Sequence, residues 1–415
     1  MKNIHFLSII FCTLLLFSCK KNDDYVLVGK PIIKSLAEIR ADIKVTSARA
    51  TNSDGEIYVA GNYLYYIAQK SGVHIFDNTN PASPKNIAFI KLQGVHDIAI
   101  KGNYLFADNY SDLVVLNISN LTNVQIVKFV ENSIPYNAEY PQGITYLDYP
   151  NVDMSDKVIV GYEIVREKNK YKNYNGPMSM EDMDMMNSTA SSGNVGIGGS
   201  YARFQINNNA LYTVDDYTLK VFNISSPSNT TFVTNVYMNS WIGGRLETLF
   251  KQGDNLFIGS TLGVHILDAS DEFNPTYKSV FSHATACDPV VVNGNTAYVT
   301  LRGGTNCNTT IQDQVNVLDV SDLTNPHLLS TYFMNQPLGV GVHNSTLFVC
   351  SGDNNLYVFD ANNSSNLLLK NKYAIQDVLD VIPLNSHLIV VGKDKIVQYN
   401  YGNNYSLEAI STVNF

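Results

Sequence analysis

The chain has 415 residues and a net charge of −9, from 28 Lys and Arg against 37 Asp and Glu. Because a single compact core rarely grows beyond about 300 residues, this length indicates several domains or one large repeat fold. Apolar residues make up 45% and charged residues 16%, a composition that excludes bulk disorder. The acidic balance argues against nucleic acid as a partner, because a nucleic-acid binder presents a basic patch.

Residues 1–18 have the features of a secretory signal peptide. Lys2 supplies a positive charge, and residues 4–17 form an apolar stretch too short for a membrane span. The stretch ends in Leu16-Phe17-Ser18-Cys19, which resembles the lipobox of bacterial lipoproteins. That resemblance implies cleavage before Cys19, diacylglycerol on its sulfur and a palmitate-type chain on its amino group. Such chains would anchor the protein firmly, because each buried CH₂ contributes about 0.8 kcal/mol.

The residues after Cys19 bear on the compartment. Lys20 follows it, whereas Asp at this place retains such lipoproteins in the inner membrane, so the resemblance implies the outer membrane. The charged run at 20–24 also resembles signals that send some lipoproteins to the cell surface; a surface and a periplasmic orientation both stay open. Residues 19–54 are expected to be a lipidated tether and lead-in. We expect a short helix within 35–43 and, at 42–48, a strand beside the last repeat.

The rest of the chain, from residue 55 to 415, is an internal repeat. Seven copies carry alternating apolar residues that end in Asp or Asn, at positions 77, 117, 223, 268, 319, 360 and 400. The intervals are 40 to 51 residues except one of 106, which contains an insertion at about 131–199 between the second and third copies. A second apolar run precedes each copy, and Asn, Ser and Pro follow as turn signals. Four strands per period predict an all-β, seven-bladed β-propeller of four-stranded blades.

Three copies carry a resemblance to a known family. The runs Leu-Val-Val-Leu-Asn at 113–117, Val-His-Ile-Leu-Asp at 264–268 and Val-Asn-Val-Leu-Asp at 315–319 resemble the LVIVD repeats of secreted or surface bacterial β-propellers. The resemblance covers about residues 55–415 and implies a fold and a recognition role, without catalytic residues. Two copies depart from it: Gln398 occupies an apolar position, and no Pro follows the copy at 355–360.

One rim of a propeller is formed by the loops that enter the innermost strands and those between the second and third strands. The insertion, the long loop at 302–313 and the starts of the innermost strands map to it. The candidate binding residues at these starts are Glu56, His96, Asp97, Arg203, Glu247, Asp288 and Asp380. We expect Arg203 to bind an anion or a sugar hydroxyl and the carboxylates to accept hydrogen bonds. The alternative is a solvated channel mouth with no ligand.

The leading hypothesis is a lipid-anchored, monomeric cell-envelope propeller that binds a protein or a glycan through this rim. It needs neither catalysis nor a cofactor, although Ca²⁺, which takes six to eight oxygen ligands, is an option at the channel mouth. The alternative is a metal-assisted hydrolase or lactonase at the same mouth. Its residues would be His96, Asp97, Glu247 and Asp288. A third hypothesis is a purely structural envelope protein.

Cysteine spacing predicts one disulfide. Cys287 begins an innermost strand and Cys307 lies in the long loop at the same rim. In an oxidising compartment we predict a Cys287–Cys307 disulfide, worth about 3 kcal/mol by the loop-entropy estimate. Cys350 is predicted to be a buried small hydrophobe.

His74 and His265 occupy one repeat position that also accepts Lys220 and Val114, which predicts blade-surface histidines rather than metal ligands. Within the insertion, 143–147 and 157–165 are predicted to be extra strands, as a hairpin over the rim, and 166–199 to be disordered. Five Met lie at 178–186. A flexible acidic loop is favoured there over a Cu(I) site, which thioethers would suit.

Overall fold

The computed structural model describes residues 25–50, 55–136, 138–169, 196–238, 244–283, 289–303 and 312–415. The predicted signal peptide, Cys19, Asp288, both cysteines of the predicted disulfide and the Met run at 178–186 lie outside these residues. Contacts divide the chain into two compact units, residues 1–36 with 138–180 and residues 37–137 with 181–415. Among the described residues, no helix has the length and apolar character needed to cross a membrane.

The smaller unit contains a three-stranded sheet in the order β11-β1-β12. Strand β1 (Tyr25–Ser35) pairs antiparallel with β12 (Lys157–Lys168) along its whole length and parallel with β11 (Tyr146–Leu147). The two strands predicted within the insertion are therefore present, but the hairpin between them is wrong, because the lead-in strand β1 separates them. β12 also continues through Lys168, into the segment predicted to be disordered.

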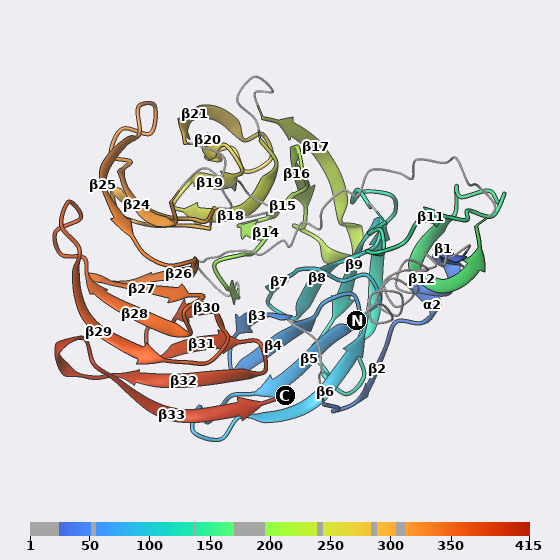
Figure 1. Cartoon of the computed structure of the whole chain (residues 1–415), viewed down its shortest axis with the longest axis horizontal. Helices are drawn as coiled ribbons and strands as arrows, with labels where there is room; N and C mark the ends of the chain where they lie inside the picture. The colour runs from blue at the N-terminus through green and yellow to red at the C-terminus, as the bar shows by residue number, and fades with distance from the viewer. Residues whose placement is uncertain are drawn as a thin grey trace, which may run out of the picture. The chain divides into compact units, whose positions relative to one another are not determined.

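In the described part of the larger unit, seven sheets each contain four consecutive antiparallel strands (Figure 1). The first four sheets comprise β3 (Gly55–Ala60), β4 (Tyr63–Ala68), β5 (Gly72–Asp77) and β6 (Lys85–Lys91); β7 (Ile98–Lys101), β8 (Tyr104–Asn109), β9 (Asp112–Asn117) and β10 (Gln125–Val130); β14 (Phe204–Asn207), β15 (Ala210–Val214), β16 (Thr218–Asn223) and β17 (Thr231–Tyr237); and β18 (Leu246–Gln252), β19 (Asn255–Ser260), β20 (Gly263–Asp268) and β21 (Thr276–Ser282).

The remaining three sheets comprise β22 (Val290–Asn293), β23 (Thr296–Leu301), β24 (Gln314–Asp319) and β25 (His327–Phe333); β26 (Pro337–His343), β27 (Thr346–Ser351), β28 (Asn355–Asp360) and β29 (Leu368–Ala374); and β30 (Val378–Pro383), β31 (Leu388–Gly392), β32 (Lys395–Tyr401) and β33 (Leu407–Asn414). Short 3₁₀ turns η1 (Pro227–Asn229) and η2 (Asn403–Tyr405) join third to fourth strands. The predicted all-β fold of four-stranded sheets is confirmed.

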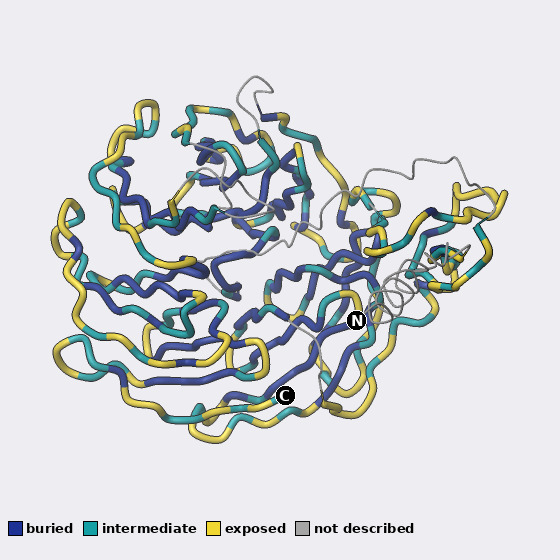
Figure 2. Tube along the Cα trace, viewed as in Figure 1, coloured by how far each residue is buried: buried dark blue, intermediate teal, exposed yellow. Residues whose placement is uncertain are grey.

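Local chemistry explains the repeat. In six copies the Asp or Asn that ends the third strand accepts a hydrogen bond from the backbone N–H two residues later, which starts the turn to the outer strand. Gly61, Gly102, Gly253 and Gly294, each with φ of 57–59°, form the tight turns between first and second strands. Figure 2 shows the inner and middle strands mostly buried and the outer strands and turns mostly exposed. The second and third strands are mostly buried because neighbouring sheets cover both of their faces.

The sheets contact one another in a cyclic order. Inner strands pack successively as β3 on β7, β7 on β14, β14 on β18, β18 on β22, β22 on β26 and β26 on β30. The last sheet then packs on the first: Ile382 and Ile389 share one apolar cluster with Ile57 and Phe76. The inner strands of the large unit therefore face a common centre, which is a propeller-like arrangement.

One prediction about the lead-in segment is wrong, namely the position of its strand. The expected helix is present as α2 (Leu36–Ala41), but the following strand β2 (Lys44–Ser47) pairs with β6, the outer strand of the first sheet. It was expected beside the last repeat. The sequence could not distinguish the two edges, because the four residues of β2 include one apolar residue and so specify neither edge.

Candidate functional site

The end of the insertion passes between the inner strands of the large unit. Residues 196–202, the axial segment, begin with a hydrogen bond from Gly196 N to the Ile100 carbonyl. Strand β13 (Ile197–Gly198) then pairs with β3, and Gly199 N donates to the Ile57 carbonyl at 3.1 Å. The axial segment therefore adds to the inner edge of the first sheet. The prediction of disorder for 166–199 is wrong at this end.

The axial segment continues across to the far sheets. Ser200 Oγ donates to Asp380 Oδ1 at 2.6 Å and accepts from Val340 N at 2.8 Å, while the Ala202 carbonyl accepts from Leu249 N at 3.0 Å. Ser200, Tyr201 and Ala202 are at most 3% exposed. The centre between the inner strands is thus occupied by the chain itself at this level. The alternative that the sequence left open, a solvated channel mouth, does not hold at these residues.

Close packing explains the glycines of this segment. A Cβ built on Gly199 would lie 1.9 Å from Asp380 Oδ2, and one on Gly196 would lie 2.2 Å from the Tyr58 ring. Gly339, on the other side of Asp380, would place a Cβ 2.1 Å from Asp380 Oδ1. The Gly-rich run at the end of the insertion is required for close approach of backbones rather than for flexibility.

Asp97, one of the predicted binding residues, connects the second and third sheets. Its Oδ2 accepts hydrogen bonds from the backbone N–H groups of Arg203 and Phe204 at 2.7 and 2.8 Å, and its Oδ1 accepts from Ile98 N. Asp97 is 2% exposed, and burial raises its pKa to about 7 in spite of these three donors. The carboxylate therefore fixes the start of the third sheet against the second.

Asp380 has a similar role at the seventh sheet. Its Oδ1 accepts from Ser200 Oγ and from Val381 N at 2.8 Å, and Gly199 and Gly339 enclose the carboxyl group. Burial raises the pKa of Asp380 to about 7. Both oxygens are covered by protein, so this carboxylate holds the axial segment in place.

The other predicted residues have separate partners. Glu56 Oε1 accepts from Gln69, and His96 Nδ1 lies 2.8 Å from Asp108 Oδ2. Glu247, 4% exposed, pairs with Arg245 at 2.8 Å, and Arg203 Nη2 lies 3.9 Å from Asp216 Oδ1. The structure places all of these at or next to inner-strand starts. Asp97 accepts from the backbone of Arg203, and the backbone N–H groups of His96 and Asp97 both donate to Asp108. Within the described ranges, no group of three or more His, Cys, Asp or Glu is arranged to hold a metal ion.

Two residues that the sequence did not single out lie at the centre. The Tyr201 hydroxyl is buried, and burial raises its pKa, with the charges of Arg302 and Asp380 acting on it. In the described part of the chain, the Tyr201 hydroxyl and the Nε atoms of Arg203 and Arg302 have no hydrogen-bond partner. Arg203 is one of the predicted binding residues and Arg302 begins the long predicted rim loop, whereas no sequence signal pointed to Tyr201.

Two exposed tyrosines lie on the rim of the third sheet. Tyr217 is 70% exposed in the turn between β15 and β16, and Tyr237, 71% exposed, ends β17. They are adjacent because Thr218 pairs with Tyr237 across the sheet. Asp215 Oδ1 accepts from Tyr217 N at 2.8 Å and fixes the turn. Asp216, in the same turn, has its Oδ1 3.9 Å from Arg203 Nη2, which connects this turn to the predicted anion-binding residue.

The repeated histidines and Cys350 are all buried. His74 is 1% exposed, with its ring 4.6 Å from that of Phe89, and burial lowers its pKa to about 4. His265 is fully buried in the fourth sheet. The prediction of blade-surface histidines is wrong, because both side chains are buried beside aromatic rings, His74 beside Phe89 and His265 beside Tyr277. The predicted burial of Cys350 is confirmed, with 0% exposure.

Comparisons with known proteins agree with the repeat and the fold. A family model described as LVIVD repeat matches residues 54–88, which cover most of the first sheet, and residues 94–131, which cover β7 to β10. No curated protein matches the sequence significantly. Among solved structures, the chain resembles the computationally designed Ika8 protein at a TM-score of 0.52, with 9% identity over 88% of this chain and 89% of that one.

Two natural structures are similar to the same degree. A protein of unknown function from Desulfotomaculum acetoxidans has a TM-score of 0.51 and 12% identity, over 86% of this chain and 95% of that one. The periplasmic gluconolactonase PpgL of Pseudomonas aeruginosa has a TM-score of 0.50 and 11% identity, over 86% and 96%. Identities this low show a shared propeller-like fold and nothing about activity.

Proposed function

We propose that this chain, which carries LVIVD repeats on a propeller-like fold, is a lipid-anchored, monomeric cell-envelope module that binds a protein or glycan through its rim. In this proposal the seven sheets are the blades of a closed β-propeller. The cyclic order of inner-strand contacts supports closure, and so does the shared apolar cluster of the first and last sheets. Loops on such a rigid scaffold commonly carry binding residues.

The observation that carries the rim proposal is the exposed pair Tyr217 and Tyr237. Tyrosine offers a large contact area at low cost in side-chain entropy, and it is enriched where partners bind. Because the Asp215 turn and the β16–β17 pairing hold both backbones, binding would order little additional chain. Arg203, which faces Asp216 in the same turn, offers a charged group for an anionic or hydroxyl-bearing part of the partner.

The hydrolase or lactonase alternative receives less support from the geometry. It needs carboxylates that face a substrate or a metal ion, yet Asp97 is used by three backbone donors and Glu247 by Arg245. Asp380 is enclosed by two glycines and Ser200. Metal analysis of purified protein before and after chelation separates the two functions, because only the alternative requires a bound ion.

Lipid attachment at Cys19 would place the smaller unit close to a membrane. Only five residues separate Cys19 from Tyr25, the first residue of β1, and five extended residues span at most about 18 Å. We propose an outer-membrane location, facing either the surface or the periplasm. Replacing Cys19 with Ala should release the protein from the membrane fraction; membrane retention of that variant would contradict lipid anchoring. Protease treatment of intact cells then distinguishes the two orientations.

Site-specific photocrosslinking tests the rim as a binding surface. Strand β17 offers a matched pair of aromatic positions at its two ends, Tyr237 at the rim and Phe232, 40% exposed, near the opposite end. A benzophenone amino acid placed at Tyr217 or Tyr237 in living cells should give a discrete covalent adduct, and the same group at Phe232 should not. Adducts that resist protease digestion indicate a glycan. Equal labelling from both ends, or none from the rim, would contradict the proposal.

A further inference from the structure

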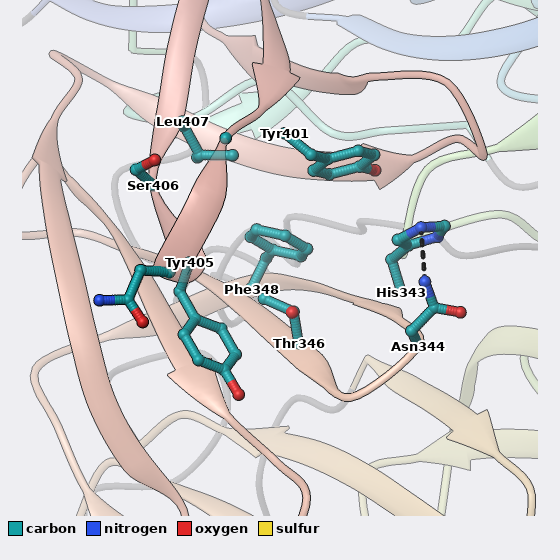
Figure 3. A pocket seen from close by; sticks show the side chains of 10 residues that line it. His343, Asn344, Thr346, Phe348, Tyr401, Tyr405, Ser406 and Leu407 are labelled. Carbon is teal, nitrogen blue, oxygen red and sulfur yellow. Dashed lines mark hydrogen bonds between the residues drawn. The ribbon is translucent and has the colours of Figure 1, made fainter.

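A cavity of about 420 Å³ lies between the sixth and seventh sheets, away from the rim (Figure 3). It is bounded by the His343-Asn344 turn, which joins β26 to β27, and by residues 402–407, which join β32 to β33. In an antiparallel four-stranded sheet these connections lie at the end opposite the turns between second and third strands. The cavity is therefore separate from Tyr217, Tyr237 and Arg203.

Aromatic rings form much of its lining. The rings of Tyr401 and His343 stack with their centroids 4.8 Å apart and their planes 2° from parallel, and Phe348 lies 6.2 Å from Tyr401. Figure 3 shows Tyr405 beside Phe348, with His343 and Asn344 on the other side. The Tyr401 hydroxyl donates to the Leu384 carbonyl at 2.8 Å, which holds this ring in place. Such rings present flat apolar faces to a ligand.

The polar part of the lining is neutral. It consists of hydroxyl and amide groups from Asn344, Thr346, Asn404 and Ser406. None of the lining residues is Asp, Glu, Lys or Arg, and burial lowers the pKa of His343, which favours the uncharged imidazole. The Asn344 amide is oriented by a 2.9 Å hydrogen bond to His343 Nε2. A ligand matched to this lining is uncharged and rich in hydroxyl or amide groups.

The loop that forms one wall has a strained backbone. Asn404 and Tyr405 are consecutive residues with φ of 60° and 64°, a region that tyrosine rarely adopts. The conformation is held by hydrogen bonds from Gly402 N to the Ser406 carbonyl and from Asn371 Nδ2 to the Tyr405 carbonyl. Strain of this kind persists mainly where surrounding structure enforces it, often at ligand sites. Here it places Tyr405 on the cavity wall.

We propose that this cavity binds a neutral saccharide, whose C–H faces would stack on the rings while its hydroxyls bond to the amides. The volume lies within the range of small-ligand sites, about 300–1,000 Å³. A proline-rich peptide also favours aromatic walls, but it relies on hydroxyl and indole donors to its carbonyls. The Tyr401 hydroxyl already donates to the Leu384 carbonyl, and the Tyr405 hydroxyl is hydrogen-bonded to Asp360 while it accepts from Asn362 Nδ2. This site is additional to the rim and does not depend on the function proposed for it.

Saturation-transfer NMR on the purified chain tests the proposal. The probes are maltotriose, cellotriose, mannobiose and N,N′-diacetylchitobiose at millimolar concentration, with a decaproline peptide as the competing class. At least one sugar should bind saturably. Tyr405→Gly should weaken it at least ten-fold, whereas Tyr217→Ala on the rim should leave it unchanged. Glycine is suited to φ of 64°, so this variant removes the ring without adding backbone strain.

The remaining outcomes also decide the question. If Tyr405→Gly does not fold, Asn404→Gly serves instead, because it removes an amide of the lining at a φ that glycine accepts. Failure of every sugar to bind the wild-type chain would overturn the proposal. So would unchanged sugar binding by the folded variant, or binding of decaproline in place of sugar.

Discussion

Asn78 and Gln398, 320 residues apart, form a reciprocal pair of side-chain hydrogen bonds between the first and last sheets. Asn78 Nδ2 donates to Gln398 Oε1 at 2.9 Å, and Gln398 Nε2 donates to Asn78 Oδ1 at 2.8 Å. Both side chains are buried. In the other six copies the position of Gln398 is Ile or Val, namely Ile75, Val115, Val221, Ile266, Val317 and Val358. A polar pair thus marks the one boundary where the ends of the repeat meet.

Replacing one member of this pair should destabilise the protein more than replacing both. Gln398→Leu leaves the buried Asn78 amide without its partner, which costs about 1–3 kcal/mol of unfolding free energy. The double variant Asn78→Ile with Gln398→Val restores the apolar chemistry of the other boundaries and should recover part of that loss. Denaturant unfolding of both single variants and the double variant measures the coupling. Strictly additive losses would contradict a coupled pair.

Gly199→Ala should destabilise the fold through the axial segment. The added methyl would lie 1.9 Å from Asp380 Oδ2, so backbone or side chain must move, at about 1–3 kcal/mol. Gly161→Ala is the matched control, since its nearest neighbouring atom lies 4.0 Å away. Thermal unfolding should separate the two variants. Equal stability would mean that the axial segment does not occupy this position in solution.

Asp380 should make stability fall as pH rises from about 4 to 7. Its pKa is raised from 3.8 to about 7 by burial, so across this range the native state keeps a proton that the unfolded state has released. Asp380→Asn cannot titrate and keeps an acceptor for Ser200, so its unfolding free energy should vary less with pH; Asp97 supplies the remaining slope.

The control for this pH dependence is Asp268→Asn. A hydrogen bond from Lys278 holds the pKa of Asp268 well below its usual range, so it does not titrate between pH 4 and 7. Its variant should follow the wild-type curve. An Asp380→Asn curve parallel to wild type would show that Asp380 is ionised throughout.

Thiol counting checks the predicted Cys287–Cys307 disulfide, whose residues lie outside the described structure. Cys350 is fully buried, and burial raises the pKa of its thiol, so alkylation of the native protein should leave it unmodified. When the protein is denatured without reductant, the total number of alkylated thiols should then be one per lipidated chain. Three thiols would contradict the disulfide, and peptide mapping identifies which cysteines are linked.

The local sequence pattern alone was enough to predict the repeat. The turn chemistry is local: six copies have an Asp or Asn side chain bonded two residues ahead, and four have a glycine at positive φ, so four-stranded sheets follow from neighbouring residues. The same alignment located the candidate residues at the starts of inner strands. It also flagged Gln398 as a departure from the motif, although it gave no partner for it.

Contacts between distant segments needed the tertiary structure. The run at 196–199 reads as disorder because glycine signals both flexible chain and close packing, and only the neighbouring Asp380 distinguishes them. The charged residues Asp97 and Asp380 predicted a solvated site. In the structure both side chains are buried and accept hydrogen bonds from distant segments, so they connect parts of the fold. Residue type and spacing thus determined which strands form and where they turn. Which sheet β2 joins, what fills the centre and which side chains remain exposed to a ligand depend on long-range packing, which short-range periodicity does not encode.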